Sequence, residues 1–266
     1  MKVIIFCINY NSYSELDYYL KSLECSDEKN GVELTVVVVD NSEKPEIINT
    51  NYSFEIINLV TNKNLGYFGG AIYGIENCKK NVSDYDYSII SNVDLSVAPD
   101  FLNKLQSIAI PDDIGCIAPK IFSSGENRNR NPKVIDRYNA KKLKVLRLMY
   151  RIPVLYYLYT TMFFANRRKK VENTTREIIY AAHGSFMIFT KKFSEFIQHM
   201  NYPVFMFGEE IFIAENLRRM DLKTIYKPEL VVHDQDHVST GKMKSNFYFK
   251  CNYKAMDMLI KEYFNE

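Results

Sequence analysis

The sequence lacks several patterns by which common classes of protein are recognised. No apolar run reaches the ~18–20 residues that a membrane-spanning helix needs. The five cysteines form no C-x-x-C pair, so buried free thiols in a reducing compartment are favoured over disulfides or a zinc site. The opening stretch KVIIFCINY is too short and too rich in β-branched residues for a signal peptide. Together these absences predict a cytoplasmic protein.

Two familiar nucleotide-binding signatures are also missing. No G-x-G-x-x-G follows the first predicted strand, and no G-x-x-x-x-G-K-[ST] occurs anywhere. The net charge of +2 gives no sign of a nucleic-acid partner. A length of 266 residues suits one large domain, or a domain with an appendage.

What the sequence does contain is a regular alternation of strand and helix patterns. Continuous β-branched runs are typical of strands that are covered on both faces, and they predict strands at 3–8, 34–40, 54–60 and 87–91, followed by 114–121, 178–190 and 222–233. Helical patterns lie between and after them, at 12–25, 68–80, 98–108, 209–220 and 245–262. This order predicts an α/β fold with a mostly parallel central sheet flanked by helices.

Polar residues follow the first four predicted strands, where ligands bind in sheets of this kind. They are Asn9, Tyr10 and Asn11 after the first strand, Asp40 after the second, Asn64 and Gly66 after the third, and Asn92, Val93 and Asp94 after the fourth. Any one of them could belong to a simple turn. All four together favour a ligand site along this edge of the sheet.

The segment NKNLGYFGG and two acidic groups suggest what that ligand is. Gly66, Gly69 and Gly70 would let backbone approach an anion at a helix start, although a loop packed on the sheet has the same composition. Asp94 could hold Mg²⁺ or Mn²⁺, because these ions prefer oxygen ligands. His233, with Asp234, Asp236 and His237 close behind, is a second candidate metal ligand.

Glu209 and Glu210 stand at the start of the predicted helix 209–220. Negative charge at a helix N-terminus is ordinary compensation of the helix dipole. Because adjacent helical residues cannot share a face, we expect one glutamate to stabilise the helix and the other to point into a cleft as a general base.

These segments in this order resemble the inverting family 2 glycosyltransferases with the GT-A nucleotide-sugar fold, and most closely their rhamnosyltransferase-like branch. The resemblance rests on CINYNS, VVVVDNS, NLGYFGG, SNVD, HGSFMIF, MFGEEIFIAENLRR and VVH, and it covers most of the chain outside about 123–176. It implies a catalytic domain over 1–244 and a C-terminal helix over 245–266.

The resemblance also implies roles for the candidate residues. The loop after the first strand and Asp40 would hold the nucleoside, and Asn64 and Gly66 would lie along the donor. Asp94 would bind the metal on the diphosphate, joined by His233, and Glu210 would deprotonate the acceptor. The sequence departs from the family where Asn92 replaces the first acid of the usual Asp-x-Asp, and where Glu210 replaces an aspartate.

The segment 133–172 is basic and aromatic. Between 133 and 170 it carries eleven of the 34 Lys and Arg residues and only one of the 32 acids, so the rest of the chain is net acidic. Its apolar stretch 152–165 is too short to span a bilayer and suits the membrane interface. Candidate contacts with membrane or acceptor are Arg147, Arg151, Tyr156, Tyr157, Arg167 and Arg168. Docking on the sheet and homodimer formation are the alternatives, and nucleic-acid binding is a weak fourth.

The sequence as a whole predicts a glycosyltransferase on the inner face of the plasma membrane. It would move a sugar from a UDP- or dTDP-sugar to a saccharide acceptor, lipid-linked in our interpretation, during cell-surface polysaccharide synthesis. The alternatives are a sugar-phosphate nucleotidyltransferase, which would need a basic glycine-rich loop after the first strand, and an inactive membrane-associated module with the same fold.

Overall fold

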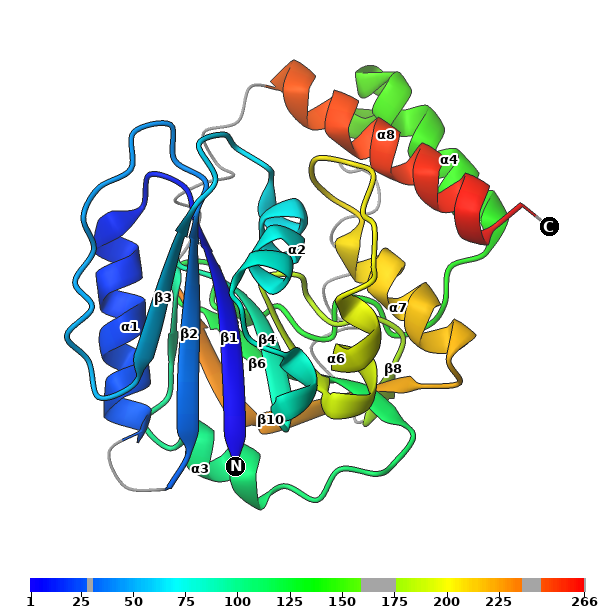
Figure 1. The fold of residues 1–266 in the computed structure, drawn as a ribbon. Helices are drawn as coiled ribbons and strands as arrows, with labels where there is room; N and C mark the ends of the chain where they lie inside the picture. Colours follow the sequence, from blue (N-terminus) through cyan, green and yellow to red (C-terminus); the bar gives the residue numbers. More distant parts are fainter. Residues whose placement is uncertain (28–30, 159–175, 236–244, 266) are drawn as a thin grey trace.

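A computed structural model describes residues 1–27, 31–158, 176–235 and 245–265, arranged around one central sheet (Figure 1). The strands are β1 Lys2–Asn9, β2 Glu33–Asp40, β3 Glu55–Val60, β4 Tyr87–Asn92, β5 Leu95–Val97, β6 Ile114–Ser123, β7 Arg128–Asn129, β8 Ile178–Ile179, β9 Phe186–Thr190 and β10 Lys223–Asp234. The helices are α1 Tyr13–Asp27, α2 Tyr67–Asn77, α3 Phe101–Ser107, α4 Ala140–Arg151, α6 Lys191–Ile197, α7 Glu209–Arg219 and α8 Ser245–Tyr263, with a 3-10 turn at Val82–Asp84.

The sheet has the strand order β3-β2-β1-β4-β9-β6-β10-β5, with β7 beside β6 and β8 beside β10. Its four longest pairings, β1 with β2, β1 with β4, β2 with β3 and β6 with β10, are parallel. β9 pairs antiparallel with both β4 and β6. The prediction of a mostly parallel α/β sheet is therefore confirmed, with an antiparallel strand inside it.

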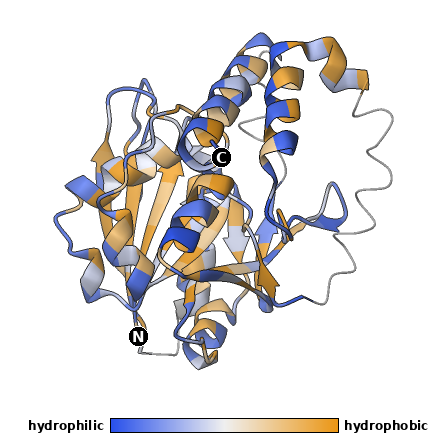
Figure 2. Ribbon diagram, turned by 90° about the vertical axis from the view of Figure 1, so that its right-hand side faces the viewer, coloured by the Kyte–Doolittle hydropathy of each residue, from blue (hydrophilic) through white to orange (hydrophobic). Residues whose placement is uncertain are grey.

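Helices cover both faces of the sheet because its central strands are apolar on both sides. Along β1, Val3, Ile5 and Cys7 belong to the core beneath α1 and α3, whereas Ile4, Phe6 and Ile8 belong to the core beneath α2 and α7. Figure 2 shows the hydrophobic colour concentrated in these strands. Because β1, β2, β3 and β4 are paired in parallel, their carboxyl ends meet at one edge of the sheet.

The stretch 178–190 differs from its predicted form. It is divided into β8 and β9, which pair with different strands, and the turn between them contains His183 and Gly184. A continuous apolar pattern cannot distinguish one strand from two, because both have the same composition. This turn contributes to the candidate site described below.

The basic segment forms α4, which packs against α8 (Figure 1). Leu143 is buried, and Arg147 Nη1 lies 2.7 Å from Asp257 Oδ1 on α8. One face of α4 therefore docks on α8, whereas the docking alternative had placed this segment on the sheet. Arg167 and Arg168 lie outside the described residues. Within the described part of the chain, no helix is long and apolar enough to cross a membrane.

Candidate functional site

At the ends of β1 and β2, the carboxylate of Asp40 is held by the protein itself. Asp40 is fully buried and accepts hydrogen bonds from Asn9 Nδ2 at 3.2 Å, the Ser42 amide at 3.0 Å and the Tyr13 hydroxyl at 2.8 Å. A carboxylate has about four lone-pair sites, so these donors occupy most of its capacity. Asp40 and Asn9 thus fix the geometry of this edge.

The neighbouring loops present the more accessible candidates. Tyr10 is 38% exposed, and Asn11 is exposed with a positive φ of 52° while its amide donates to Ser42 Oγ at 2.8 Å. Asn64 is half-buried, and its side-chain oxygen accepts from the Gly66 amide at 2.8 Å. Tyr10 and Asn11 can therefore meet a ligand directly, whereas Asn64 shapes the loop.

The three glycines have different surroundings. A Cβ on Gly66, whose φ is +76°, would lie 1.9 Å from the Phe205 carbonyl oxygen, and one on Gly70 would lie 2.9 Å from Asn41 Nδ2. Gly69 has only Leu65 nearby, at 3.7 Å. Contacts within the chain therefore explain why Gly66 and Gly70 must be glycines. This agrees with the alternative that the loop is packed on the protein at these two positions.

Asp94 follows β4 and lies close to a second acid, Asp234, at the end of β10. Burial, and then the charge of Asp234, raise the pKa of Asp94, while Arg130 and a hydrogen bond from Asn92 act in the opposite direction. Asp234 is buried and pairs with Arg130, with Nε and Oδ2 3.1 Å apart. Val93, between Asn92 and Asp94, is also buried. The result is a mixed cluster of two acids and one guanidinium.

His233 does not join this cluster in the way we expected. Its side chain is exposed, and successive residues of a strand point to opposite faces, so His233 and Asp234 lie on opposite sides of β10. Asp236 and His237 lie outside the described residues. Leu230, Val232 and Asp234 alternate along the buried face, so the period of two in the sequence contained the signal that Asp234 points inward.

Glu209 and Glu210 begin α7, and the structure brings both carboxylates to the same place. A Cβ on Gly184 would lie 3.0 Å from Glu209 Oε1 and 3.4 Å from Glu210 Oε1. Our expectation that only one of them would face a cleft was therefore wrong. Because Gly184 has no side chain, both glutamates can converge over the turn before β9.

The acid pair has an unusual electrostatic environment. Burial, followed by the charge of Glu210, raises the pKa of Glu209 to about 8. The hydroxyl of Tyr67 is buried and has no hydrogen-bond partner within the described structure. Burial raises the pKa of Tyr67, and Glu209, Asp94 and Glu210 add to the effect. The charges of all three acids therefore act on the Tyr67 hydroxyl.

Lys133 completes the site, although no local pattern in the sequence indicates it. Its ammonium nitrogen lies 3.3 Å from Glu210 Oε1. The residue belongs to the basic segment, which we interpreted as a membrane contact, with docking on the sheet, homodimer formation and nucleic-acid binding as the alternatives. No periodicity within that segment indicates a contact with a glutamate that comes 77 residues later in the sequence.

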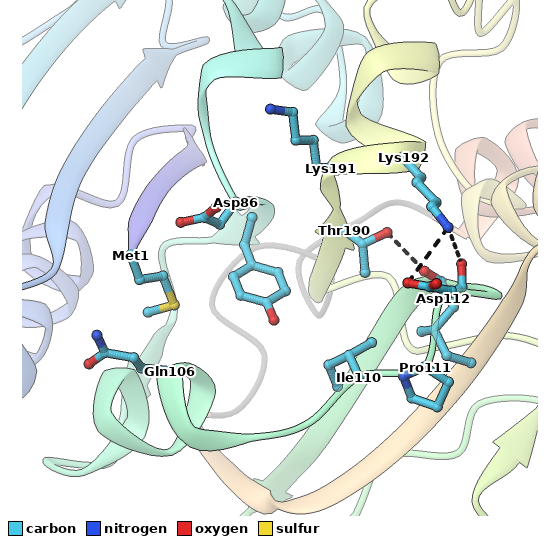
Figure 3. A pocket seen from close by; sticks show the side chains of 11 residues that line it. Met1, Asp86, Gln106, Ile110, Pro111, Asp112, Thr190, Lys191 and Lys192 are labelled. Atoms are coloured by element: carbon cyan, nitrogen blue, oxygen red, sulfur yellow. Dashed lines mark hydrogen bonds and ion pairs between the residues drawn. The ribbon is translucent and has the colours of Figure 1, made fainter.

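A pocket of about 400 Å³ lies elsewhere (Figure 3). It is lined by Met1 before β1, Tyr87 at the start of β4, and Thr190 and Lys192 where β9 passes into α6. This is the edge where the parallel strands begin, opposite to Asp40 and Asp94. It contains none of the candidate residues and is not the candidate site.

Solved structures with this architecture are glycosyltransferases of the GT-A fold. The mannosyltransferase PcManGT from Pyrobaculum calidifontis, in complex with GDP-Man and Mn²⁺, matches with a TM-score of 0.53 and 13% identity, over 90% of this chain and 58% of that one. GalNAc-T7 with UDP, GalNAc and Mn²⁺ matches with a TM-score of 0.56 and 12% identity, over 98% of this chain and 49% of that one. S. aureus TarS matches with a TM-score of 0.54 and 10% identity, over 98% of this chain and 40% of that one. At such identities the likeness establishes the fold.

Sequence comparison then identifies the family. The family model described as glycosyl transferase family 2 matches residues 3–192, so the chain belongs to that family. Comparison with curated proteins finds no significant match. The chain spans about half the length of the solved structures that it resembles.

Proposed function

We propose that this protein is an inverting glycosyltransferase that moves a sugar from a UDP- or dTDP-sugar to a saccharide acceptor. The observation that carries the proposal is the convergence of Glu209 and Glu210 over Gly184, next to Ser185, whose carbonyl oxygen accepts from the Asn92 amide at 2.9 Å where β4 ends. Membership of glycosyl transferase family 2 supports the same reaction class.

In this proposal the strand-end loops hold the donor. Tyr10 and Asn11 would contact the nucleoside from exposed positions, on a framework fixed by Asn9 and Asp40. The N-terminus of α2 carries partial positive charge, which favours the diphosphate, and Gly69 leaves room near it. Asn64 and Gly66 would shape this approach, and Asn92 and Val93 would place Asp94.

The residues present suit a divalent cation bound together with the diphosphate. Across the parts of the chain that the structure describes, no three His, Cys, Asp or Glu side chains group closely enough to hold a metal alone. Asp94 and Asp234 nevertheless offer two adjacent carboxylates, whose repulsion a cation would relieve. Mg²⁺ commonly uses one or two carboxylates and completes its shell with phosphate oxygens and water. When bound there, Mg²⁺ or Mn²⁺ would offset negative charge on the departing diphosphate.

Glu210 is the base in the proposed reaction. It takes the proton from the acceptor hydroxyl, whose oxygen forms a bond to the anomeric carbon. The bond from that carbon to the diphosphate oxygen breaks, and its electron pair leaves with the nucleoside diphosphate. One displacement from the opposite side inverts the anomeric centre. Glu209, beside the base, keeps its own proton at neutral pH because its pKa is raised to about 8.

The test is a thermal-shift panel of UDP, dTDP, GDP, CDP and ADP, each with and without Mn²⁺ or Mg²⁺. A ligand that binds only the native state raises the melting temperature with the logarithm of its saturation. Metal-dependent stabilisation by UDP or dTDP is the expected result. Stabilisation by GDP instead would indicate a GDP-sugar as the donor. No shift with any nucleotide would overturn the proposal in favour of an inactive module.

The basic segment supports the finer proposal that the enzyme works at an anionic membrane surface and takes a lipid-linked acceptor. The face of α4 away from α8 is apolar, with Val145 48%, Leu148 50% and Ile152 42% exposed. Exposed apolar side chains continue to Val154, Leu155, Tyr157 and Leu158. Exposed Lys141, Lys144 and Arg151 accompany them, which suits anionic headgroups.

The other candidate contacts of this segment divide between the two faces. Arg147 is bound to Asp257 and Tyr156 stacks on Tyr150, with ring centroids 5.4 Å apart, so both serve the docked side. Tyr157 is 54% exposed and would serve the membrane side. In this proposal the enzyme is peripheral on the cytoplasmic face and contributes to surface polysaccharide synthesis.

Vesicle co-sedimentation tests the membrane proposal. The wild type should sediment with phosphatidylglycerol vesicles, and Val145→Glu with Leu148→Glu should weaken the partition at least tenfold. Ile47→Glu is a matched control, because Ile47 is fully exposed on a loop far along the chain from α4. Equal partition of the double variant and the control would remove the proposal. If the molecular mass of the wild type in solution rises with protein concentration and that of the double variant does not, this face is a dimer interface instead.

A further inference from the structure

Lys133 contacts the acid pair from a fixed backbone position. Two residues before it, Asn131 is buried, and its side-chain oxygen accepts from the His183 amide at 2.7 Å. One residue after it, Val134 forms an antiparallel bridge with Ala181, with N–O distances of 3.1 and 3.0 Å. Lys133 is thereby held beside the turn that contains Gly184.

The two glutamates at that turn are chemically alike but differ in their contacts. Both approach Gly184, yet Lys133 pairs with Glu210, whose side chain is only 14% exposed, against 43% for the lysine. Two carboxylates this close to each other resist ionising together. An ammonium beside one of them favours the negative charge on that one.

Asp94 is a further acid whose charge acts on the same site, whereas the neighbouring phenols and the His183 ring are neutral. The phenols of Tyr67 on α2, Tyr150 on α4 and Tyr202 before α7 all interact electrostatically with Glu210, and the pKa of each is raised, first by burial. The pKa of His183 is lowered well below its ordinary value by burial and then by Lys133, so its ring is neutral. The distribution of the pair's charge therefore depends on Lys133.

We propose that Lys133 is a positioning residue for the transfer reaction, whose ammonium group pairs with Glu210 and favours the negative charge of the acid pair on that carboxylate. The assignment rests on the proposed function, in which Glu210 accepts the proton of the acceptor hydroxyl. It also gives the basic segment a second role, because that segment supplies part of the site as well as an exposed apolar face.

The test is a pH titration of the protein labelled with ¹³C at the glutamate side-chain carboxyl carbons, followed by NMR. Glu209→Gln and Glu210→Gln assign the two signals. In Lys133→Gln we expect the first ionisation of the acid pair to move about one pH unit higher, a tenfold gain in proton affinity, because the ion pair is partly exposed. Lys133→Arg should restore the wild-type midpoint, and Lys141→Gln is the matched control at an exposed lysine.

An unchanged midpoint for the first ionisation of the pair in Lys133→Gln would overturn the inference, and so would a shift that Lys133→Arg leaves in place. Once the thermal-shift panel identifies a donor, the transfer rate can be measured against pH. In Lys133→Gln the acid limb of this pH profile should move to higher pH together with the midpoint. If the midpoint moves and no nucleotide binds, the proposed function fails while the charge assignment stands. If transfer occurs with the same pH profile in Lys133→Gln, the role of Lys133 fails while the proposed function stands.

Discussion

Two sets of buried acids lie at the same edge of the sheet, and the protein treats them differently. The carboxylate of Asp40 is surrounded by three donors of the protein itself. Asp94 and Glu209 instead lie near other acids, and their pKa values are raised, first by burial. A carboxylate whose hydrogen-bonding capacity is filled stabilises the fold. One that is buried beside like charge costs stability, and such arrangements cluster at functional sites.

The largest expected effect concerns the acid proposed to react. Glu210→Gln should lower the transfer rate by about a hundredfold to ten-thousandfold, the usual contribution of a general base. Donor affinity should be retained, since the amide keeps the shape of the side chain. Rates with the donor found by the thermal-shift panel, together with calorimetric donor binding, check both parts. Undiminished turnover would remove Glu210 from the mechanism.

Replacement of Asp40 should lower the free energy of unfolding by an amount comparable to the rise in the activation free energy in Glu210→Gln. Asp40→Ala leaves the buried donors of Asn9 and Ser42 and the half-buried hydroxyl of Tyr13 without their acceptor, and we expect a loss of about 3 kcal/mol in the free energy of unfolding. Urea denaturation measures it. Asp84→Ala, at an exposed aspartate, is the control. A loss no larger than that of the control would contradict the structural role of Asp40.

Asp94 should behave in the opposite way. Asp94→Asn removes one of two repelling buried charges, so we expect stability equal to the wild type or higher. The same change should weaken the metal-dependent part of nucleotide binding by about tenfold, because a carboxylate ligand is lost. Titration calorimetry with and without Mn²⁺ separates the two contributions. Affinity that is unchanged under both conditions would sink the assignment of Asp94 to the metal.

The stability of the protein should also depend on pH through Glu209. The folded-state pKa of Glu209, about 8, exceeds its ordinary value of 4.5, so the folded protein binds this proton more tightly than the unfolded chain does. Its contribution to stability is complete below pH 4.5 and is lost as the pH rises to about 8. Relative to Glu209→Gln, the wild type should therefore melt at a lower temperature at pH 9 than at pH 5. Parallel melting curves across this range would contradict it.

The sequence was sufficient for the features that depend on local pattern. The β-branched runs predicted the parallel strands, and Cys7, Cys78 and Cys116 are buried as their apolar neighbours indicated. The ends of the strands correctly indicated an edge rich in polar groups. Such features repeat within a few residues, so they can be recognised without knowing what packs against them.

The features that the sequence did not predict depend on contacts between distant segments. Glu209 and Glu210 converge because Gly184 has no side chain, and no pattern around the glutamates reveals that. Lys133 reaches Glu210 only because the segment that contains it is tied to the turn before β9. Asp234 is the exception, since the alternation along β10 already placed it on the buried face and His233 on the other.

The pairing of α4 with α8 has a consequence for synthesis of the protein. About 95 residues separate the end of α4 from the start of α8, so the ribosome completes α4 well before its partner exists. Until α8 emerges, Leu143, Leu146 and Tyr150 have no complete cover, and the nascent chain presents apolar residues on both sides of one basic helix. During that interval we expect the growing chain to be prone to aggregation and to need chaperones until α8 is made.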